Sequence, residues 1–221
     1  MYSPGIEAGT YYKREVASSL LADVLGFDDL VPKTTFREWY GKQGSMQQYV
    51  PDTRTAKRTP TAKMYDGDED LARGALFDYI TGNVDRHHGN WLITGGGNLV
   101  LIDNGLSMPG EYNPKTYGFL TRGKSQNLTV AGGDKERKVS SNMEMIRESV
   151  LRNLPMPDVS HMADRWPDVE HALRSAGVDD QAIALTKQRF DVIVSGRYQR
   201  IRDLPAYWQG KAFQPSLRSV F

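Results

Sequence analysis

The hydrophobic positions near the start of the chain recur with the period of a helix. In residues 10–25, Val16, Leu20 and Val24 form one apolar stripe and a second stripe lies beside it. Gly26 follows the last apolar residue, as is common at helix C-termini. Two segments rich in β-forming residues come next, at 34–40 and 45–50, with the letters GKQG between them. The pattern predicts a helix followed by an antiparallel strand pair.

A second helix and a hairpin are predicted in the middle of the chain. Residues 51–67 contain two prolines and a basic run, and we expect a solvated connection; the run comprises Arg54, Lys57, Arg58 and Lys63. Three acidic residues at 68–70 suit the N-terminus of a helix. Its expected buried face comprises Leu71, Ala75, Leu76, Tyr79 and Ile80, and Asp78 is expected to be solvated. The runs NWLIT and NLVLID then flank GGG, which predicts a hairpin.

The second half of the chain is predicted to be mainly helical. Residues 107–138 have few periodic apolar positions, so a long irregular segment is expected there. Helices are predicted at 140–153, 167–176 and 179–204. The four tryptophans are expected in packing positions. The order of elements indicates an α+β fold with a helical C-terminal half.

Composition narrows the classes of function. Hydrophobic residues make up 39% and charged residues 25% of the 221 positions, as in globular proteins. The net charge of +1 gives no indication of nucleic-acid binding. The absence of cysteine excludes thiolate chemistry and cysteine-ligated metals. No apolar run approaches the length of a membrane span and no secretory h-region is present, so a cytoplasmic location is expected.

Polar side chains are concentrated in one turn before the predicted hairpin. The letters DRHHGN place Asp85 and Asn90 five residues apart, and Asp103 ends the second strand of the hairpin. Phosphoryl transfer needs a carboxylate that orients the acceptor hydroxyl, together with carboxylate and amide oxygens that hold Mg²⁺. These three residues therefore indicate a phosphotransferase.

The motifs DRHHGN and LIDNG resemble the catalytic loop and the metal-binding triplet of the phosphoinositide 3-/4-kinase-like branch of the kinase superfamily. They are also similar to those of HipA-like and other atypical kinases. The resemblance implies that Asp85, Arg86 and His87 are catalytic residues of this loop, with Asp85 as the catalytic aspartate. It implies metal binding by Asn90 and Asp103. Asn104 stands where common protein kinases have phenylalanine.

The resemblance extends upstream and implies a two-lobed fold. By this resemblance, Glu15 corresponds to the helix glutamate that pairs with a nucleotide-binding lysine. The backbone of Gln48, Tyr49 and Val50 corresponds to the hinge that meets the adenine edge. Residues 1–66 would be a reduced N-lobe of a few antiparallel strands and one helix. Residues 67–221 would be a mainly helical C-lobe.

A glycine-rich loop and a strand lysine are not found before Glu15. Lys13 lies two positions away on the same predicted helix, so the two side chains do not face each other. The chain is then a fragment, a minimal kinase, or a relic that binds without catalysing. Lys57, Lys63 or a partner chain could supply the missing charge.

Other interpretations of the turn stay open. His87 and His88 with the two aspartates could form a metallohydrolase site, with only His161 and His171 as further histidines. Otherwise His87 is expected to hydrogen-bond to the backbone near Asp103, and His88 to be exposed. Arg86 either pairs with a carboxylate of the activation segment or is solvated.

The sequence thus predicts an ATP-dependent kinase that uses Mg²⁺ or Mn²⁺ and phosphorylates a hydroxyl of a protein or small molecule. The alternative, from a different class, is a pseudokinase or truncated binding module without catalysis. Neither nucleic acid nor a membrane span is expected.

Overall fold

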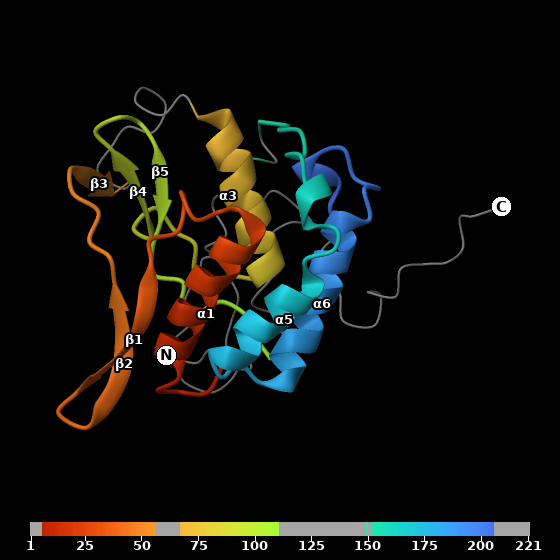
Figure 1. Cartoon of the computed structure of the whole chain (residues 1–221). Coiled ribbons are helices and arrows are strands. Elements are labelled where there is room, and N and C mark those ends of the chain that lie inside the picture. Colours follow the sequence, from red (N-terminus) through yellow and green to blue (C-terminus); the bar gives the residue numbers. More distant parts are fainter. Residues whose placement is uncertain (1–5, 56–66, 111–148, 150–151, 206–221) are drawn as a thin grey trace, which may run out of the picture.

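A computed structural model gives the fold of residues 6–55, 67–110, 149 and 152–205 (Figure 1). Four α-helices and two small antiparallel sheets are present in these residues. The helices gather on one side of the molecule and the sheets on the other (Figure 1). The α+β class expected from the sequence is confirmed.

The first helix is α1 (Tyr11–Leu25), as predicted. It ends at Gly26, whose φ of 77° is left-handed and favours glycine. α1 packs against α5 (Trp166–Ser175) and against the first strand. Arg14 of α1 also forms an ion pair of 2.7 Å with Asp179, the N-cap of α6 (Asp180–Val194).

The predicted strand pair is β1 (Thr34–Trp39) and β2 (Lys42–Gln47), in register from Thr34–Gln47 to Trp39–Lys42. The turn falls one residue earlier than expected, because Tyr40 and Gly41 form it with φ values of 48° and 70°. Positive φ at both central residues matches the twist of a two-residue hairpin. Most of GKQG therefore belongs to β2.

The predicted hairpin in the middle of the chain is β4 (Trp91–Thr94) and β5 (Leu99–Leu101), and β3 (Thr53–Thr55) adds a third strand in the order β3-β4-β5. The solvated connection expected over residues 51–67 therefore contains a strand at Arg54, which pairs with Ile93, and the expectation was wrong there. The other basic residues of that run lie outside the described residues; they are Lys57, Arg58 and Lys63.

The middle helix is α3 (Asp68–Thr81), with the expected apolar face buried. It ends at Gly82, where φ is 62°. A side chain at Gly82 would meet the guanidinium of Arg189 from α6 at 2.8 Å, so it would have to displace that group. Arg189 donates to the carbonyl of Ile80 at 2.8 Å and stabilises this helix end.

The predicted C-terminal helix over 179–204 was too long. α6 ends at Val194, and Gly196 with a φ of 66° turns the chain toward a short 3₁₀ helix, η3 (Ile201–Asp203). Another short helix, η2 (Ser160–Met162), precedes α5. Most of the predicted irregular segment and of the predicted helix at 140–153 lies outside the described residues.

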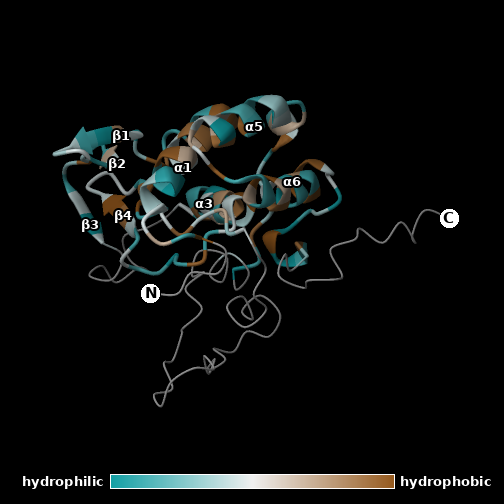
Figure 2. Ribbon diagram, turned by 90° about the horizontal axis from the view of Figure 1, so that it is seen from below, coloured by the Kyte–Doolittle hydropathy of each residue, from teal (hydrophilic) through white to brown (hydrophobic). Residues whose placement is uncertain are grey.

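The main core lies between the helices and the second sheet. In Figure 2, β4 is largely hydrophobic whereas β1 and β3 are hydrophilic. Trp91 is 2% exposed and Trp166 packs on Phe190, as expected. Trp39 is 63% exposed, against expectation, and Trp208 lies outside the described residues. In the described part of the chain, no helix is long and apolar enough to span a bilayer.

Candidate active site

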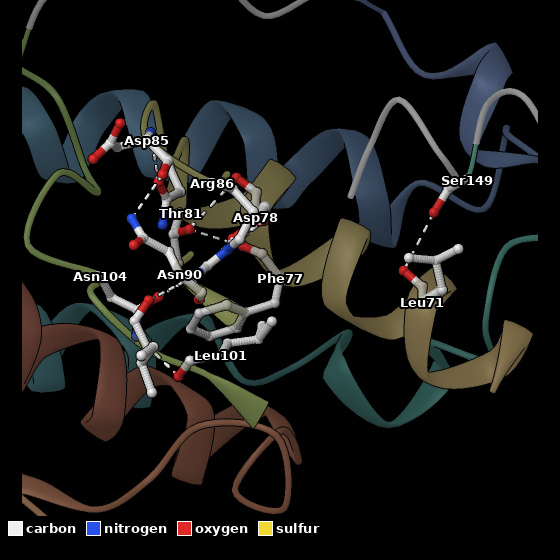
Figure 3. Close-up of polar contacts among 12 residues, drawn as sticks. Leu71, Phe77, Asp78, Thr81, Asp85, Arg86, Asn90, Leu101, Asn104 and Ser149 are labelled. Atoms are coloured by element: carbon white, nitrogen blue, oxygen red, sulfur yellow. Dashed lines mark hydrogen bonds and ion pairs between the residues drawn. The ribbon is translucent and has the colours of Figure 1, made fainter. Parts of the chain in front are cut away.

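The polar turn lies between the end of α3 and the start of β4. After Gly82 reverses the chain, the side-chain oxygen of Asn83 accepts a hydrogen bond of 2.8 Å from the backbone N–H of Asp85. This bond is typical of asparagine-initiated turns. It places Asp85 at the half-buried rim, with its carboxylate directed away from Arg86 (Figure 3).

Asn90 is buried beside Asp85. Its side-chain N–H₂ donates to the carbonyl of Asp85 at 2.9 Å, so the amide oxygen points to the other side and can act as a ligand. The carbonyl of Asn90 accepts a bond of 3.0 Å from the N–H of Ile102. Because Ile102 directly precedes Asp103, this bond brings the end of β5 next to the turn.

Asp103 follows β5 and is exposed, so its carboxylate is open to a ligand. Its φ of 56° is left-handed, which is uncommon for a residue with a side chain. The segment after it returns to the turn, since Val84 donates to the Leu106 carbonyl at 3.1 Å and Met108 to the Thr81 carbonyl at 2.6 Å. The candidate catalytic and metal-binding residues thus lie on adjacent, hydrogen-bonded segments.

Arg86 lies beneath the turn rather than at its surface. Its side chain is 0% exposed and pairs with Asp78 of α3, also 0% exposed, at 3.0 Å. Neither of the two expected environments of Arg86 is correct, and the expectation that Asp78 is solvated was wrong. Burial raises the pKa of Asp78, while the charge and hydrogen bonds of Arg86 oppose that rise. Asp78 is thus the buried carboxylate that faces the buried guanidinium.

The two histidines differ from expectation. Nδ1 of His87 accepts a bond of 2.9 Å from the N–H of Gly89, so His87 braces its own turn rather than the backbone near Asp103. A side chain at Gly89 would meet the His87 ring at 2.8 Å. His88 is half-buried and stacks on Trp91, with ring centroids 5.6 Å apart.

Glu15 reaches the site from α1. A side chain built on Gly105 would lie 3.3 Å from its carboxylate oxygen, so Glu15 borders the segment after Asp103. Burial raises the pKa of Glu15; the backbone N–H groups of Asn104 and Gly105 oppose the rise, and the charge of Asp103 adds to it. This glutamate therefore lies against the segment 103–105, which contains the candidate metal ligand Asp103.

The lysines near α1 point elsewhere. The ammonium of Lys13 lies 3.6 Å from the position that a side chain on Gly177 would take, after α5. Lys33 pairs with Asp23. Neither of these two lysines is directed to the triplet that Glu15 borders.

The predicted hinge backbone is partly engaged within the protein. The N–H of Gln48 donates to the Lys33 carbonyl at 2.8 Å, and the Val50 carbonyl accepts from the Thr53 hydroxyl at 3.2 Å. Tyr49 between them is exposed.

Three further polar residues of the site were not identified from the sequence. Asn83 could have been found from the spacing of an asparagine turn. Asp78 lies seven residues after Leu71 and three after Ala75, on the apolar stripe of its helix, so its position indicated burial although its charge led to the expectation that it is solvated. Asn104, whose Oδ1 accepts from Arg86 at 2.5 Å, carries no sequence signal of that contact.

The donor set fits a hard cation such as Mg²⁺, which prefers carboxylate and amide oxygens and keeps several waters. The exposed Asp103 carboxylate and the amide oxygen of Asn90, whose N–H₂ group is taken up by the Asp85 carbonyl, have this chemistry. The metallohydrolase alternative needs at least three histidine or carboxylate ligands together. Within the described ranges no such group is found.

Residues 42–156, just over half of the chain, match the family model of phosphatidylinositol 3- and 4-kinases. The matched segment contains the polar turn and the residues around Asp103, whereas α1 with Glu15 lies outside it. No curated protein matches the chain. The resemblance to HipA-like kinases stays a prediction. From its site and this match, the chain belongs to the phosphatidylinositol 3- and 4-kinase family.

Proposed function

We propose that this protein transfers the γ-phosphoryl group of ATP to a hydroxyl of a protein or small molecule. One observation carries the proposal: the Ile102–Asn90 backbone bond joins the segment of Asp103 to a turn in which Asn90 also bonds Asp85. A candidate base and two candidate metal ligands therefore meet within one small region. Phosphoryl transfer depends on positioning and charge stabilisation, which this arrangement favours.

Each of the three residues has a distinct role in the proposed reaction. Asp85 orients the acceptor hydroxyl and accepts its proton while the new O–P bond forms and the bond to the ADP oxygen breaks. Asn90 and Asp103 would hold Mg²⁺ or Mn²⁺, and the ion would supply positive charge that offsets the charge of the nucleotide phosphates.

The remaining predicted site residues support the nucleotide. Glu15 orders the segment that carries Asp103, and the backbone at Gln48, Tyr49 and Val50 borders the adenine. His87 shapes the catalytic turn through its bond to Gly89. In this proposal residues 1–66 and 67–221 act as a reduced N-lobe and a C-lobe.

A binding module without catalysis is the second candidate. The placements of Lys13 and Lys33 favour it, because neither provides the phosphate-binding charge that kinases place beside the helix glutamate. In an active enzyme that charge would come from Lys57, Lys63 or a partner chain.

Calorimetric titration with a non-hydrolysable ATP analogue, with and without Mg²⁺, tests the shared part of both candidates. Wild type should bind in a Mg²⁺-dependent manner, and Asp103→Ala should lose this dependence. Asp28→Ala, an exposed aspartate remote from the turn in sequence, is the matched control and should bind as wild type does. Equal affinity in wild type and Asp103→Ala would exclude both candidates.

Phosphate release from ATP separates the two candidates. An enzyme should show slow Mg²⁺-dependent hydrolysis that Asp85→Ala abolishes while nucleotide binding persists, because Asp85 serves the acceptor rather than the metal. Binding without turnover in any acceptor screen would favour the binding module.

A further inference from the structure

The side chain of Arg86 contacts both segments that carry the proposed metal ligands (Figure 3). Its Nη1 donates to the main-chain carbonyls of Asn90 at 2.6 Å and Ile102 at 2.7 Å. Its Nη2 donates to Oδ1 of Asn104 at 2.5 Å. Ile102 and Asn104 are the two neighbours of Asp103. One guanidinium therefore bonds to Asn90 and to both sides of Asp103.

Burial prevents Arg86 from touching a nucleotide or an acceptor. The side chain is 0% exposed, and Asp78 contacts its Nε and Nη2 at 3.0–3.2 Å. Its charge is therefore neutralised inside the protein and is not available to phosphates. A direct catalytic role, as the sequence motif suggested, does not fit this position.

The conformation of Asp103 explains why such a contact is needed. A residue with a side chain at a φ of 56° keeps that conformation only when its surroundings hold it. The bonds from Arg86 fix the residue before Asp103 and the residue after it. The guanidinium is planar and presents its donors in a fixed geometry. It therefore also sets the distance from Asn90 to Ile102 and to Asn104.

We propose that Arg86 is a positioning residue whose guanidinium sets the spacing between Asn90 and Asp103 for a shared divalent cation. The proposal rests on the function proposed above. A lysine in its place keeps the charge but has a single nitrogen without the planar fork, so it cannot hold three separate acceptors in the same arrangement.

Arg86→Lys tests the proposal, with Arg189→Lys as a matched control. Arg189 is equally buried and also donates to main-chain carbonyls, those of Ile80 and Thr81, but its described contacts include neither metal-binding segment. Both variants should lower the thermal midpoint. Only Arg86→Lys should raise the Mg²⁺ concentration for half-maximal binding of the ATP analogue, by about 10- to 100-fold.

A milder variant guards against loss of folding. Asn104→Ala removes one of the bonds made by Arg86 and leaves the ion pair with Asp78 in place. Its Mg²⁺ half-saturation should rise about tenfold, at the lower end of such effects. Asn98→Ala, at the exposed turn between β4 and β5, should leave it unchanged. Mn²⁺ electron paramagnetic resonance gives a second measure of the same shift without nucleotide turnover.

The outcomes separate this inference from the proposed function. Mg²⁺-dependent binding in wild type, with the same half-saturation in Asn104→Ala as in Asn98→Ala, would overturn the positioning role alone. The positioning role would also be overturned if Arg86→Lys folded and showed the same Mg²⁺ half-saturation as Arg189→Lys. No Mg²⁺-dependent binding in wild type would overturn the proposed function and this inference with it.

Discussion

Two regions of the molecule depart from the usual distribution of polar and apolar residues in opposite ways. The buried polar cluster, formed by Asp78, Arg86, Asn90 and Asn104, is almost fully withdrawn from water. The β1–β2 hairpin exposes Trp39, Tyr40 and Met46 among its large apolar side chains. The first region sits under the candidate active site, and the second lies beside α1.

The difference shows that burial of a side chain in this protein depends on the hydrogen-bond, charge or packing partners that it finds, rather than on its residue type. In the cluster each buried polar group has a nearby group of opposite charge or a hydrogen-bond partner, which offsets the cost of desolvation. The hairpin packs one face on α1 through the Tyr12–Phe36 ring pair, 5.9 Å apart. The pairing register places Trp39 and Met46 on the opposite face, where they are exposed.

Removing the counter-charge in the cluster should have the largest effect. Asp78→Ala leaves a buried guanidinium without its carboxylate and should lower the free energy of unfolding by about 3–5 kcal/mol. Urea denaturation measures the change. The exposed Asp28→Ala should change it by less than about 0.5 kcal/mol. A similar small change in both variants would show that Arg86 is solvated after all.

The tryptophans of the two regions provide the second test. Trp91 lies next to the cluster and is 2% exposed. Trp91→Ala should lower the free energy of unfolding by about 3–5 kcal/mol, because apolar burial is lost and a cavity remains. Trp39→Ala on the hairpin is expected to cost less than about 1 kcal/mol, because this side chain is 63% exposed. Equal costs in urea denaturation would mean that another surface covers the hairpin in solution.

Glu15 should give the smallest and most pH-dependent effect. Because burial raises its pKa above the ordinary value of 4.5, protonation favours the folded state. Its stabilising contribution is present below about pH 4.5 and is lost as pH rises through the raised pKa. At pH 7 the buried charge costs stability, so Glu15→Gln should be more stable than wild type by about 1 kcal/mol.

Thermal unfolding at several pH values measures this difference. The gap between Glu15→Gln and wild type should narrow as the pH falls toward 4. Glu38→Gln, an exposed substitution on the hairpin, should change the midpoint little at pH 7. A gap that stayed constant with pH would contradict the proposed origin in burial of the charge.

Local sequence patterns were sufficient to predict those elements whose structure is determined by neighbouring residues. α1, α3, the β4–β5 hairpin and the α+β class follow from periodicity, acidic first-turn residues and glycine stops. The same patterns failed where a distant contact decides. Periodic apolar positions continue past Gly196, yet the chain turns there, and Arg54 joins a sheet whose other strands lie some 40 residues later in the sequence.

The sequence by itself determined the candidate residues Asp85, Asn90 and Asp103, because their order and spacing are local and chemically specific. Only the tertiary structure decided where Arg86 points. Its partners come from α3, from the turn and from the end of β5, so no spacing in the sequence identifies them. Burial creates this dependence, since a guanidinium removed from water needs a partner for its charge, and folding alone determines which carboxylate is near.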